Sequence, residues 1–278
     1  MKYGVVYANT VAPTPEAAAE LARVAEEEGF ESLWTTEHVV VPAGYRSTYP
    51  YSKSGKMAGG AEDFDSPDPI VWLSYLAAVT STLRLATGVL ILPLRNPVAL
   101  AKEVATLDVL SGGRVTLGVG AGWLEEEFAA LGVPFADRGR RTDEYIAALR
   151  SLWTEELASF SGEFVSFADV YCRPLPVQRP IPIVIGGHSM RAARRAGELG
   201  DGFFPASASW EELPGLVVAV RESAERMGRD PEAIEVTMGT RPEQEWMDRL
   251  AAIGVDRIVI PAGYGLDALR AFAARFIR

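Results

Sequence analysis

The chain has 278 residues, of which 48% are hydrophobic and 23% are charged. This is the composition of an ordinary globular protein, and it argues against extended disorder, a collagen-like fibre or a disulfide scaffold. Asp and Glu outnumber Lys and Arg by 37 to 27, which gives a formal net charge of -10. Because nucleic acids and anionic membranes are bound by an excess of cations, we expect neither as a partner.

Soft metal ligands and targeting segments are also scarce. The chain has one cysteine, Cys172, and two histidines, His38 and His188. This set cannot form an internal disulfide and is too small for a structural zinc site, so we expect no metal. No run approaches the ~18 apolar residues of a membrane span, and the first residues read as a strand rather than a signal peptide. We therefore expect a cytoplasmic protein.

Short runs rich in β-branched residues alternate along the chain with segments of helical period, which predicts parallel βα units. The runs are Lys2–Ala8, Ser32–Thr36, Arg84–Leu92, Val115–Val119, Ile181–Ile185, Gly202–Pro205, Ile234–Met238 and Arg257–Ile260. Eight parallel strands in a chain near the typical ~250 residues predict an α/β fold, a (β/α)₈ TIM barrel. We expect it to form a single domain over residues 1–278.

Capping residues mark the helices between these strands. Thr14-Pro15-Glu16 supplies an N-cap, a first-turn proline and an acidic first turn, and Gly29 ends that helix. Asn96-Pro97 begins a second helix that ends at Gly112-Gly113. A third is expected over Arg141–Trp153, where aromatic and aliphatic residues recur every four positions.

Two connections are too long to be simple turns, and we expect them as insertions after strands two and four. Residues Pro42–Ser66 mix Gly and Ser with several tyrosines. This segment is either a lid over a ligand or a loop that packs its own tyrosines. Residues Thr154–Arg179 contain the alternating stretch Gly162–Phe167, which predicts a small hairpin before strand five.

Glu37 and His38 follow strand two, at the end of the barrel where such folds place their chemistry. Imidazole titrates near neutrality, so His38 is a candidate catalytic residue; the alternative is a hydrogen-bonded structural histidine. If the strand continues, Glu37 and His38 point in opposite directions and only one faces the barrel centre.

Two glycine-rich turns are candidate ligand sites. Gly118–Gly122, followed by Trp123, leaves strand four without side chains that would block a flat ligand; the alternative is tight packing against a helix. Gly186–Ser189 follows strand five and begins a helix that carries Arg191, Arg194 and Arg195, as anion sites at helix N-termini do. For Arg194 and Arg195 we expect a solvated helix face instead. Gly239-Thr240-Arg241, after strand seven, is a rival phosphate site.

Other chemistries fail on their residue requirements. The two histidines lie in different units, against metal-dependent hydrolysis, and no lysine ends a strand where Schiff-base chemistry would need it. Arg191 replaces the last glycine of a nucleophile elbow, and Trp123 replaces the third glycine of a dinucleotide-binding turn.

Several blocks occur in one order along nearly the whole chain: Trp34–Pro42, Thr87–Pro97, Ala105–Arg114, Gly118–Trp123, Glu127-Phe128, Ile183–Gly187 and Gly200–Phe203. In residues, order and spacing they resemble the luciferase-like monooxygenase superfamily, and more narrowly its oxidoreductases that depend on the deazaflavin coenzyme F420. The resemblance implies a tricyclic ring held at the carboxyl ends of the strands, with the coenzyme phosphate near the helix after strand five.

The resemblance also carries expectations for single residues. His38 matches the histidine placed near the ring, with Glu37 beside it as the second catalytic candidate. Gly88-Val89 occupies the place of a non-prolyl cis peptide, and Trp123 stands where other members have a carboxylate. The residues expected to bind the cofactor are Thr87, Gly88, Val89, Gly120, Ala121, Gly122, Trp123, Gly186, Gly187, His188, Ser189 and Arg191.

The function implied first is hydride transfer between F420 and a small organic substrate, with His38 stabilising or protonating the reacting group. Flavin-dependent relatives often have a phosphate-binding arginine where this chain has Ala121, which favours the deazaflavin over FMN. The alternatives are an FMN-dependent monooxygenase fed by a separate reductase, and a coenzyme-binding protein without turnover. Related proteins are often homodimers, so we expect a homodimer.

Overall fold

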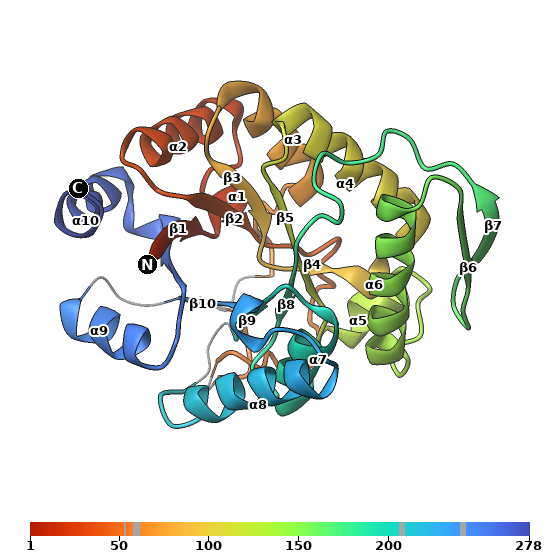
Figure 1. Cartoon of the computed structure of the whole chain (residues 1–278). Helices are drawn as coiled ribbons and strands as arrows, with labels where there is room; N and C mark the ends of the chain where they lie inside the picture. Colours follow the sequence, from red (N-terminus) through yellow and green to blue (C-terminus); the bar gives the residue numbers. More distant parts are fainter. Residues whose placement is uncertain (53, 58–61, 206–208, 240–242) are drawn as a thin grey trace.

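The computed structural model describes residues 1–52, 54–57, 62–205, 209–239 and 243–278. Its centre is a closed parallel barrel of eight strands, as predicted (Figure 1). The strands are β1 (Lys2–Val6), β2 (Ser32–Thr35), β3 (Arg84–Thr87) with β4 (Leu90–Ile91), β5 (Val115–Gly120), β8 (Ile183–Gly186), β9 (Gly202–Phe204), β10 (Glu235–Gly239) and β11 (Arg257–Pro261). Neighbouring strands pair in parallel, and pairing of β3 with β5 closes the ring.

The third barrel strand differs from its prediction. It was expected to run unbroken over Arg84–Leu92, but it is divided into β3 and β4 by a cis peptide bond between Gly88 and Val89, and Leu92 already begins the short helix η2 (Leu92–Leu94). The first strand is likewise shorter than predicted, because Ala8 begins helix α1 (Ala8–Val11).

Helices surround the barrel (Figure 1). They are α2 (Pro15–Glu27), α3 (Pro69–Val79), α4 (Pro97–Ser111), α5 (Glu125–Ala130), α6 (Arg138–Thr154), α7 (Met190–Leu199), α8 (Leu213–Arg226), α9 (Gln244–Ala252) and α10 (Leu266–Phe276), with the short helices η3 (Pro231–Ala233) and η4 (Ala262–Tyr264). The predicted caps are present: the Thr14 side chain accepts from the Ala17 amide, and Asn96 accepts from the Val98 and Ala99 amides. Gly112 ends α4 with a φ of 68°. None of the helices in the described ranges combines the length and the apolar character needed to cross a bilayer.

The core has two layers. Side chains that point into the barrel form one buried cluster: Val6, Trp34, Ala86, Val184, Phe204 and Val259. Their strand neighbours, such as Val5 and Leu33, belong to the larger cluster between strands and helices. This alternation is what a parallel barrel buried on both faces requires.

The predicted hairpin is formed by β6 (Ala158–Ser161) and β7 (Ser166–Val170), which pair antiparallel and lie at the edge of the molecule beyond α6 (Figure 1). Its turn is tied to α6, because the Glu144 carboxylate accepts from the amides of Glu163, Phe164 and Val165.

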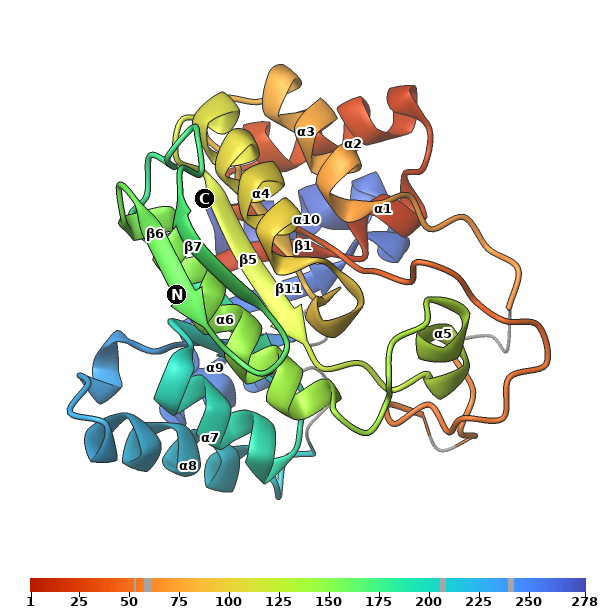
Figure 2. The same ribbon diagram turned by 90° about the vertical axis from the view of Figure 1, so that its right-hand side faces the viewer.

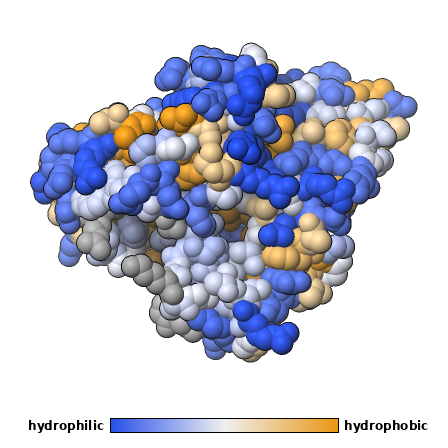
Figure 3. All heavy atoms as spheres, turned by 90° about the horizontal axis from the view of Figure 1, so that it is seen from below, coloured by the Kyte–Doolittle hydropathy of each residue, from blue (hydrophilic) through white to orange (hydrophobic). Residues whose placement is uncertain are grey.

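The connection between β2 and α3 contains no helix or strand in its described residues. Figure 2 shows this connection and α5 on the side toward which the arrow of β5 points, so both lie at the carboxyl end of the barrel. Seen from below, the surface is mostly hydrophilic, and the apolar residues in view form separate groups (Figure 3).

Candidate active site

The carboxyl end of the barrel brings the predicted site residues together. His38 follows β2, Gly88-Val89 follows β3, Trp123 follows β5 and Gly186–Ser189 follows β8. These strands run in parallel in one closed barrel, so their carboxyl ends face the same opening.

His38 is held by a carboxylate that the sequence did not single out. Its Nδ1 atom lies 2.9 Å from Oε2 of Glu127, whose side chain is fully buried in α5. The other carboxylate oxygen accepts from the amides of Val39 at 2.6 Å and Val40 at 3.3 Å. An ionised Glu127 carboxylate can only accept, so the imidazole that pairs with it carries a proton on Nδ1. The His38 side chain is only 13% exposed, and no hydrogen bond joins its Nε2 atom to another described residue.

Glu127 occurs in one of the sequence blocks quoted above, but nothing in the sequence gave it a function. It is the third of three consecutive glutamates in the first turn of α5, four residues after Trp123. Only the folded structure shows that this glutamate, and not Glu125 or Glu126, reaches the end of β2. Glu126 instead accepts from Ser47 and from the Arg46 amide, and these hydrogen bonds lower its pKa to about 2.

Glu37 and His38 have different partners, although both line one hollow; β2 ends at Thr35, so the strand does not continue through the pair. The Glu37 carboxylate accepts from the Ile91 amide and pairs with Arg95. Burial raises the pKa of Glu37, even though the charge of Arg95 opposes this. Arg95 also pairs with Asp68, which caps α3 by accepting from the Ile70 amide. Glu37 therefore connects β2, β4 and the start of α3.

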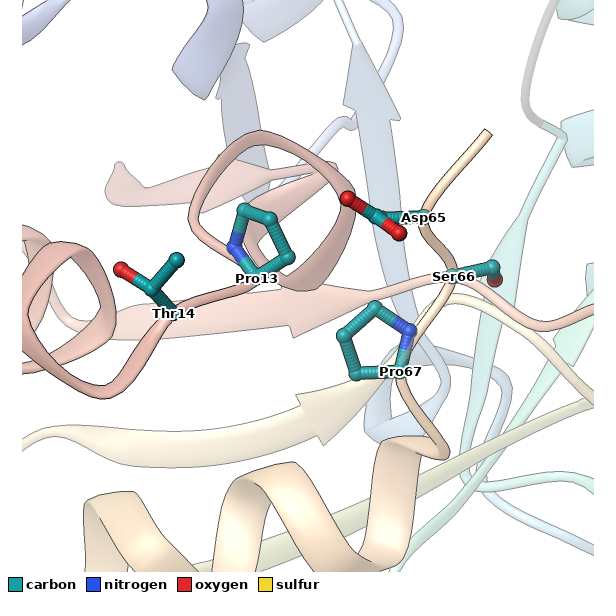
Figure 4. Close-up of a pocket in the computed structure, with 5 residues that line it drawn as sticks. All are labelled: Pro13, Thr14, Asp65, Ser66 and Pro67. Atoms are coloured by element: carbon teal, nitrogen blue, oxygen red, sulfur yellow. The ribbon is translucent and has the colours of Figure 1, made fainter. Parts of the chain in front are cut away.

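Two hollows border this region. One of about 180 Å³ is lined by residues of both networks, namely Glu37, His38, Val39, Ser66, Asp68, Pro69, Leu94 and Arg95. The other is an open depression in which Pro13 and Thr14, before α2, face Asp65, Ser66 and Pro67, before α3 (Figure 4). Ser66 belongs to both, so the end of the long connection forms a rim beside His38.

The glycines of β5 and β8 make room for the Gly88-Val89 peptide, which has the cis geometry that the resemblance implied. A Cβ atom on Gly120 would lie 2.7 Å from the Val89 side chain, and one on Gly186 would lie 2.4 Å from it. A Cβ on Gly118 would lie 1.9 Å from the Thr87 carbonyl oxygen. Close packing thus accounts for these glycines, and their contact with a cofactor stays a prediction.

The turn before α7 has the features of a ligand site. Gly187 adopts a φ of +125°, and the Ser189 side chain caps the helix by accepting from the Ala192 amide. The Nδ1 atom of His188 is buried without a hydrogen-bond partner among the described residues. Buried polar atoms are nearly always paired in folded proteins, so a ligand atom at this turn would complete the site.

The arginines of α7 divide into two groups. Arg191 is exposed. The pKa of Arg138 is lowered mainly by the burial of Arg138 itself and also by the nearby positive charge of Arg191. Arg194 is exposed, as expected, but Arg195 is buried and paired with Asp143, so its expected place on a solvated face is wrong. At the rival phosphate site Gly239 ends β10, and Thr240 and Arg241 lie outside the described residues.

Tyrosines of the long connection pack onto Trp123 rather than only onto one another. The Tyr45 and Tyr49 rings lie 5.5 and 5.0 Å from Trp123, each edge to face, and Tyr51 lies 5.0 Å from His188. The connection therefore covers the turns that follow β5 and β8.

Comparison with known proteins identifies the family and the fold of the chain. The sequence model of the family described as luciferase-like monooxygenase matches residues 1–242. An uncharacterized protein of Mycobacterium tuberculosis is 35% identical over 93% of this chain and 91% of its own length. Among solved structures, an F420-dependent secondary alcohol dehydrogenase has a TM-score of 0.78 at 19% identity, covering 99% of both chains, which shows the same fold.

Two relatives with named activities use different cofactors. An F420-dependent glucose-6-phosphate dehydrogenase of Kineococcus radiotolerans is 34% identical over 81% of this chain and 63% of its own length. An FMNH₂-dependent dimethylsulfone monooxygenase of Pseudomonas putida is 35% identical over 75% of this chain and 53% of its own length. The chain spans only about half to two thirds of these two proteins.

Proposed function

Because the chain belongs to the luciferase-like monooxygenase family, whose members include both F420-dependent oxidoreductases and FMN-dependent monooxygenases, we propose that it is an oxidoreductase that uses coenzyme F420. The proposed reaction transfers a hydride between the deazaflavin and a small organic substrate. When bound, the coenzyme supplies or accepts the hydride.

The observation that carries this proposal is the His38–Glu127 pair at the barrel mouth. Hydride transfer to a carbonyl or imine carbon leaves negative charge on the neighbouring oxygen or nitrogen, which then takes a proton. His38 delivers this proton from Nε2 when both ring nitrogens carry a proton, because Nδ1 is held by Glu127. The ring is left neutral, with its remaining proton on Nδ1. In the reverse direction Nε2 accepts the proton of an alcohol or amine. Trp123, 5.7 Å from the imidazole in an edge-to-face contact, helps to fix the ring.

Glu37 has a supporting function in this proposal. Its carboxylate is engaged by Ile91 and Arg95, so it is not free to exchange a proton with a substrate. It is a positioning residue that ties the end of β2 to β4, the strand that follows the Gly88-Val89 peptide.

The cofactor would be held by the turns after three strands. Gly186, Gly187 and Ser189, with Arg191 beside them, would bind the phosphate, and the unpaired Nδ1 of His188 would gain a partner there. Thr87, Gly88 and Val89 would lie beneath the ring, and Gly120, Ala121, Gly122 and Trp123 beside it. Ala121 supports F420 over FMN, since flavin-dependent relatives often carry an arginine at this place.

The alternative cofactor has support of its own in the FMNH₂-dependent relative from Pseudomonas putida. The two functions differ in their need for oxygen: a deazaflavin carries hydride and reacts poorly with oxygen, whereas a reduced flavin in the same barrel supports monooxygenation.

An anaerobic turnover assay separates these functions. Purified protein is mixed with reduced F420 and a panel of ketones, enones, imines and sugar phosphates, and the absorbance of the oxidised deazaflavin is followed. We expect oxidation that needs both protein and a substrate and is lost in His38→Ala. Substrate-dependent oxygen uptake with reduced FMN, together with no deazaflavin oxidation, would overturn the proposal.

A further inference from the structure

A continuous chain of aromatic rings crosses the carboxyl end of the barrel. From His38 it passes to Trp123 at 5.7 Å between ring centroids, then to Tyr49 at 5.0 Å, to Tyr51 at 5.2 Å and to His188 at 5.0 Å. The chain of rings therefore joins the proposed proton donor, His38, to the proposed phosphate-binding turn at His188. A ligand bound between these two residues would lie beside the rings.

The rings meet at angles that leave flat faces available. All four contacts are edge to face, with interplanar angles between 66° and 87°. In such a pair the ring that points its edge at the partner keeps both of its own faces free of that partner. A planar conjugated molecule can stack its whole face on such a ring, whereas a sugar ring presents only its C–H groups.

Tyr45 and Lys56 pack against the chain of rings and hold Trp123 in place. Tyr45 is buried, lies 5.5 Å from Trp123, and accepts a hydrogen bond from the Met57 amide. The Lys56 ammonium lies 3.8 Å from the centre of the Tyr45 ring, donates to the Tyr45 carbonyl and pairs with Glu62. The Lys56 cation is thus already engaged within the connection.

Two carboxylates beside the rings are already satisfied by hydrogen bonds. Glu126 is satisfied by Ser47 and the Arg46 amide, and Glu127 by His38 and two amides. Burial raises the pKa of Tyr49 and of Tyr51, so both phenols stay uncharged at neutral pH. The three central side chains, Trp123, Tyr49 and Tyr51, therefore form an uncharged aromatic wall.

We propose that the site accepts planar, uncharged, conjugated substrates, and that Tyr49 and Tyr51 are the residues that determine this specificity. The inference rests on the proposed function, because it concerns the substrate side of the same site. It distinguishes this chain from its relative that is named a glucose-6-phosphate dehydrogenase: the Trp123, Tyr49 and Tyr51 side chains offer a sugar phosphate no cation.

Calorimetric binding of chosen probes tests the inference without turnover. Benzylideneacetone is planar, conjugated and uncharged, cyclohexylacetone is uncharged but not planar, and glucose 6-phosphate is anionic. Each is titrated into the protein alone, with oxidised F420 and with FMN. We expect benzylideneacetone to bind at least about tenfold more tightly than the other two in the best-binding state.

Variants assign the preference to the two tyrosines. Tyr49→Ala and Tyr51→Ala should each weaken benzylideneacetone binding several-fold and together by about tenfold or more, whereas Tyr49→Phe and Tyr51→Phe keep it. Tyr171→Ala, a change at a tyrosine that is 71% exposed at the end of β7, is the matched control and should have no effect. Equal binding of all three probes, no binding of benzylideneacetone in any state, or full binding by the double alanine variant would overturn the inference.

The outcomes separate this inference from the proposed function. If F420 does not bind but benzylideneacetone binds the protein alone or with FMN and needs the two tyrosines, the cofactor proposal fails and the substrate class stands. If F420 binds and the probe preference is absent, the cofactor proposal stands and the substrate class is wrong.

Discussion

The two ends of the barrel bury charged side chains, but they pair them differently. At the amino-terminal end the Arg257 side chain, 4% exposed, donates to both oxygens of Glu31, to Glu235 and to Thr237. At the carboxyl end His38 has one nitrogen bonded to Glu127 and the other without a bond to a described residue.

This difference separates stability from chemistry. The hydrogen-bond donors of Arg257 are all directed at neighbouring acceptors, so this group serves the fold and not a ligand. Around His38 the ring is oriented but one nitrogen is left over, as proton transfer requires. Changes at the amino end should therefore alter unfolding, and changes at the carboxyl end should alter turnover.

The largest effect is expected for Arg257→Met. This change leaves Glu31 without its buried partner, while Glu235 keeps its ion pair with Lys2. Removal of one side of a buried ion pair costs about 3–5 kcal/mol, and because both carboxylates are partly exposed we expect about 3 kcal/mol. Urea unfolding measures the change. Arg23→Ala is the control, because the exposed pair of Arg23 with Glu27 contributes at most about 0.5 kcal/mol. Equal unfolding midpoints for the two variants would show that the amino end does not depend on this network.

The counterpart at the other end is His38→Ala. We expect turnover to fall about 100- to 1000-fold, as general acid–base catalysis by one residue predicts, with coenzyme binding nearly unchanged. The unfolding midpoint should shift much less than in Arg257→Met, since two amides still bond Glu127. Retained turnover with unchanged coenzyme binding would remove His38 from the mechanism.

Glu127→Gln should have a smaller effect on turnover. Glutamine still offers an oxygen to the Val39 and Val40 amides but no longer provides a charged acceptor for Nδ1 of His38. We expect kcat to fall about tenfold while KM stays within a factor of about two, because Glu127 acts through His38 and does not touch the substrate. A rise in KM at unchanged kcat would instead place Glu127 in substrate binding.

The smallest effect concerns Glu26 in α2, at the amino-terminal side. Burial would raise its pKa, but hydrogen bonds from the amides of Ser81, Thr82 and Leu83 lower it from 4.5 to about 2. A lowered pKa stabilises the fold above pH 4.5, and this contribution is lost as the pH falls toward 2. Glu26→Gln should therefore cost about 1 kcal/mol at neutral pH and almost nothing near pH 2, when followed by urea unfolding. Glu27→Gln is the control, and a pH-independent difference in Glu26→Gln would contradict the assignment.

The barrel was predictable from the sequence because most strands are short apolar runs rich in β-branched residues, and because several helices begin at a capping side chain, as Thr14 and Asn96 show. What local patterns miss is contact between distant residues. The break at Gly88-Val89 depends on space left by glycines of two other strands. The burial of Arg195 depends on Asp143 of α6, which begins at Arg138 and not at the expected Arg141.

The candidate site shows the same limit. His38 and the glycine turns could be predicted as site residues from their position alone, because they occur at the carboxyl ends of strands. Glu127 lies 89 residues from His38 in sequence, and three adjacent glutamates offered no basis for choosing it. Strand alternation predicted opposite directions for Glu37 and His38 only if the strand continued, and β2 ends at Thr35. The partners Arg95 and Asp68 that hold Glu37 in place were not predicted.

The most direct test of the account is a titration of the purified apo-protein with oxidised F420 and, separately, with FMN, followed by quenching of its six tryptophans. Trp123 lies beside the proposed ring site and should report binding. The account predicts saturable quenching by F420 and at least about tenfold weaker binding of FMN. Tighter binding of FMN, or no binding of either coenzyme, would contradict it.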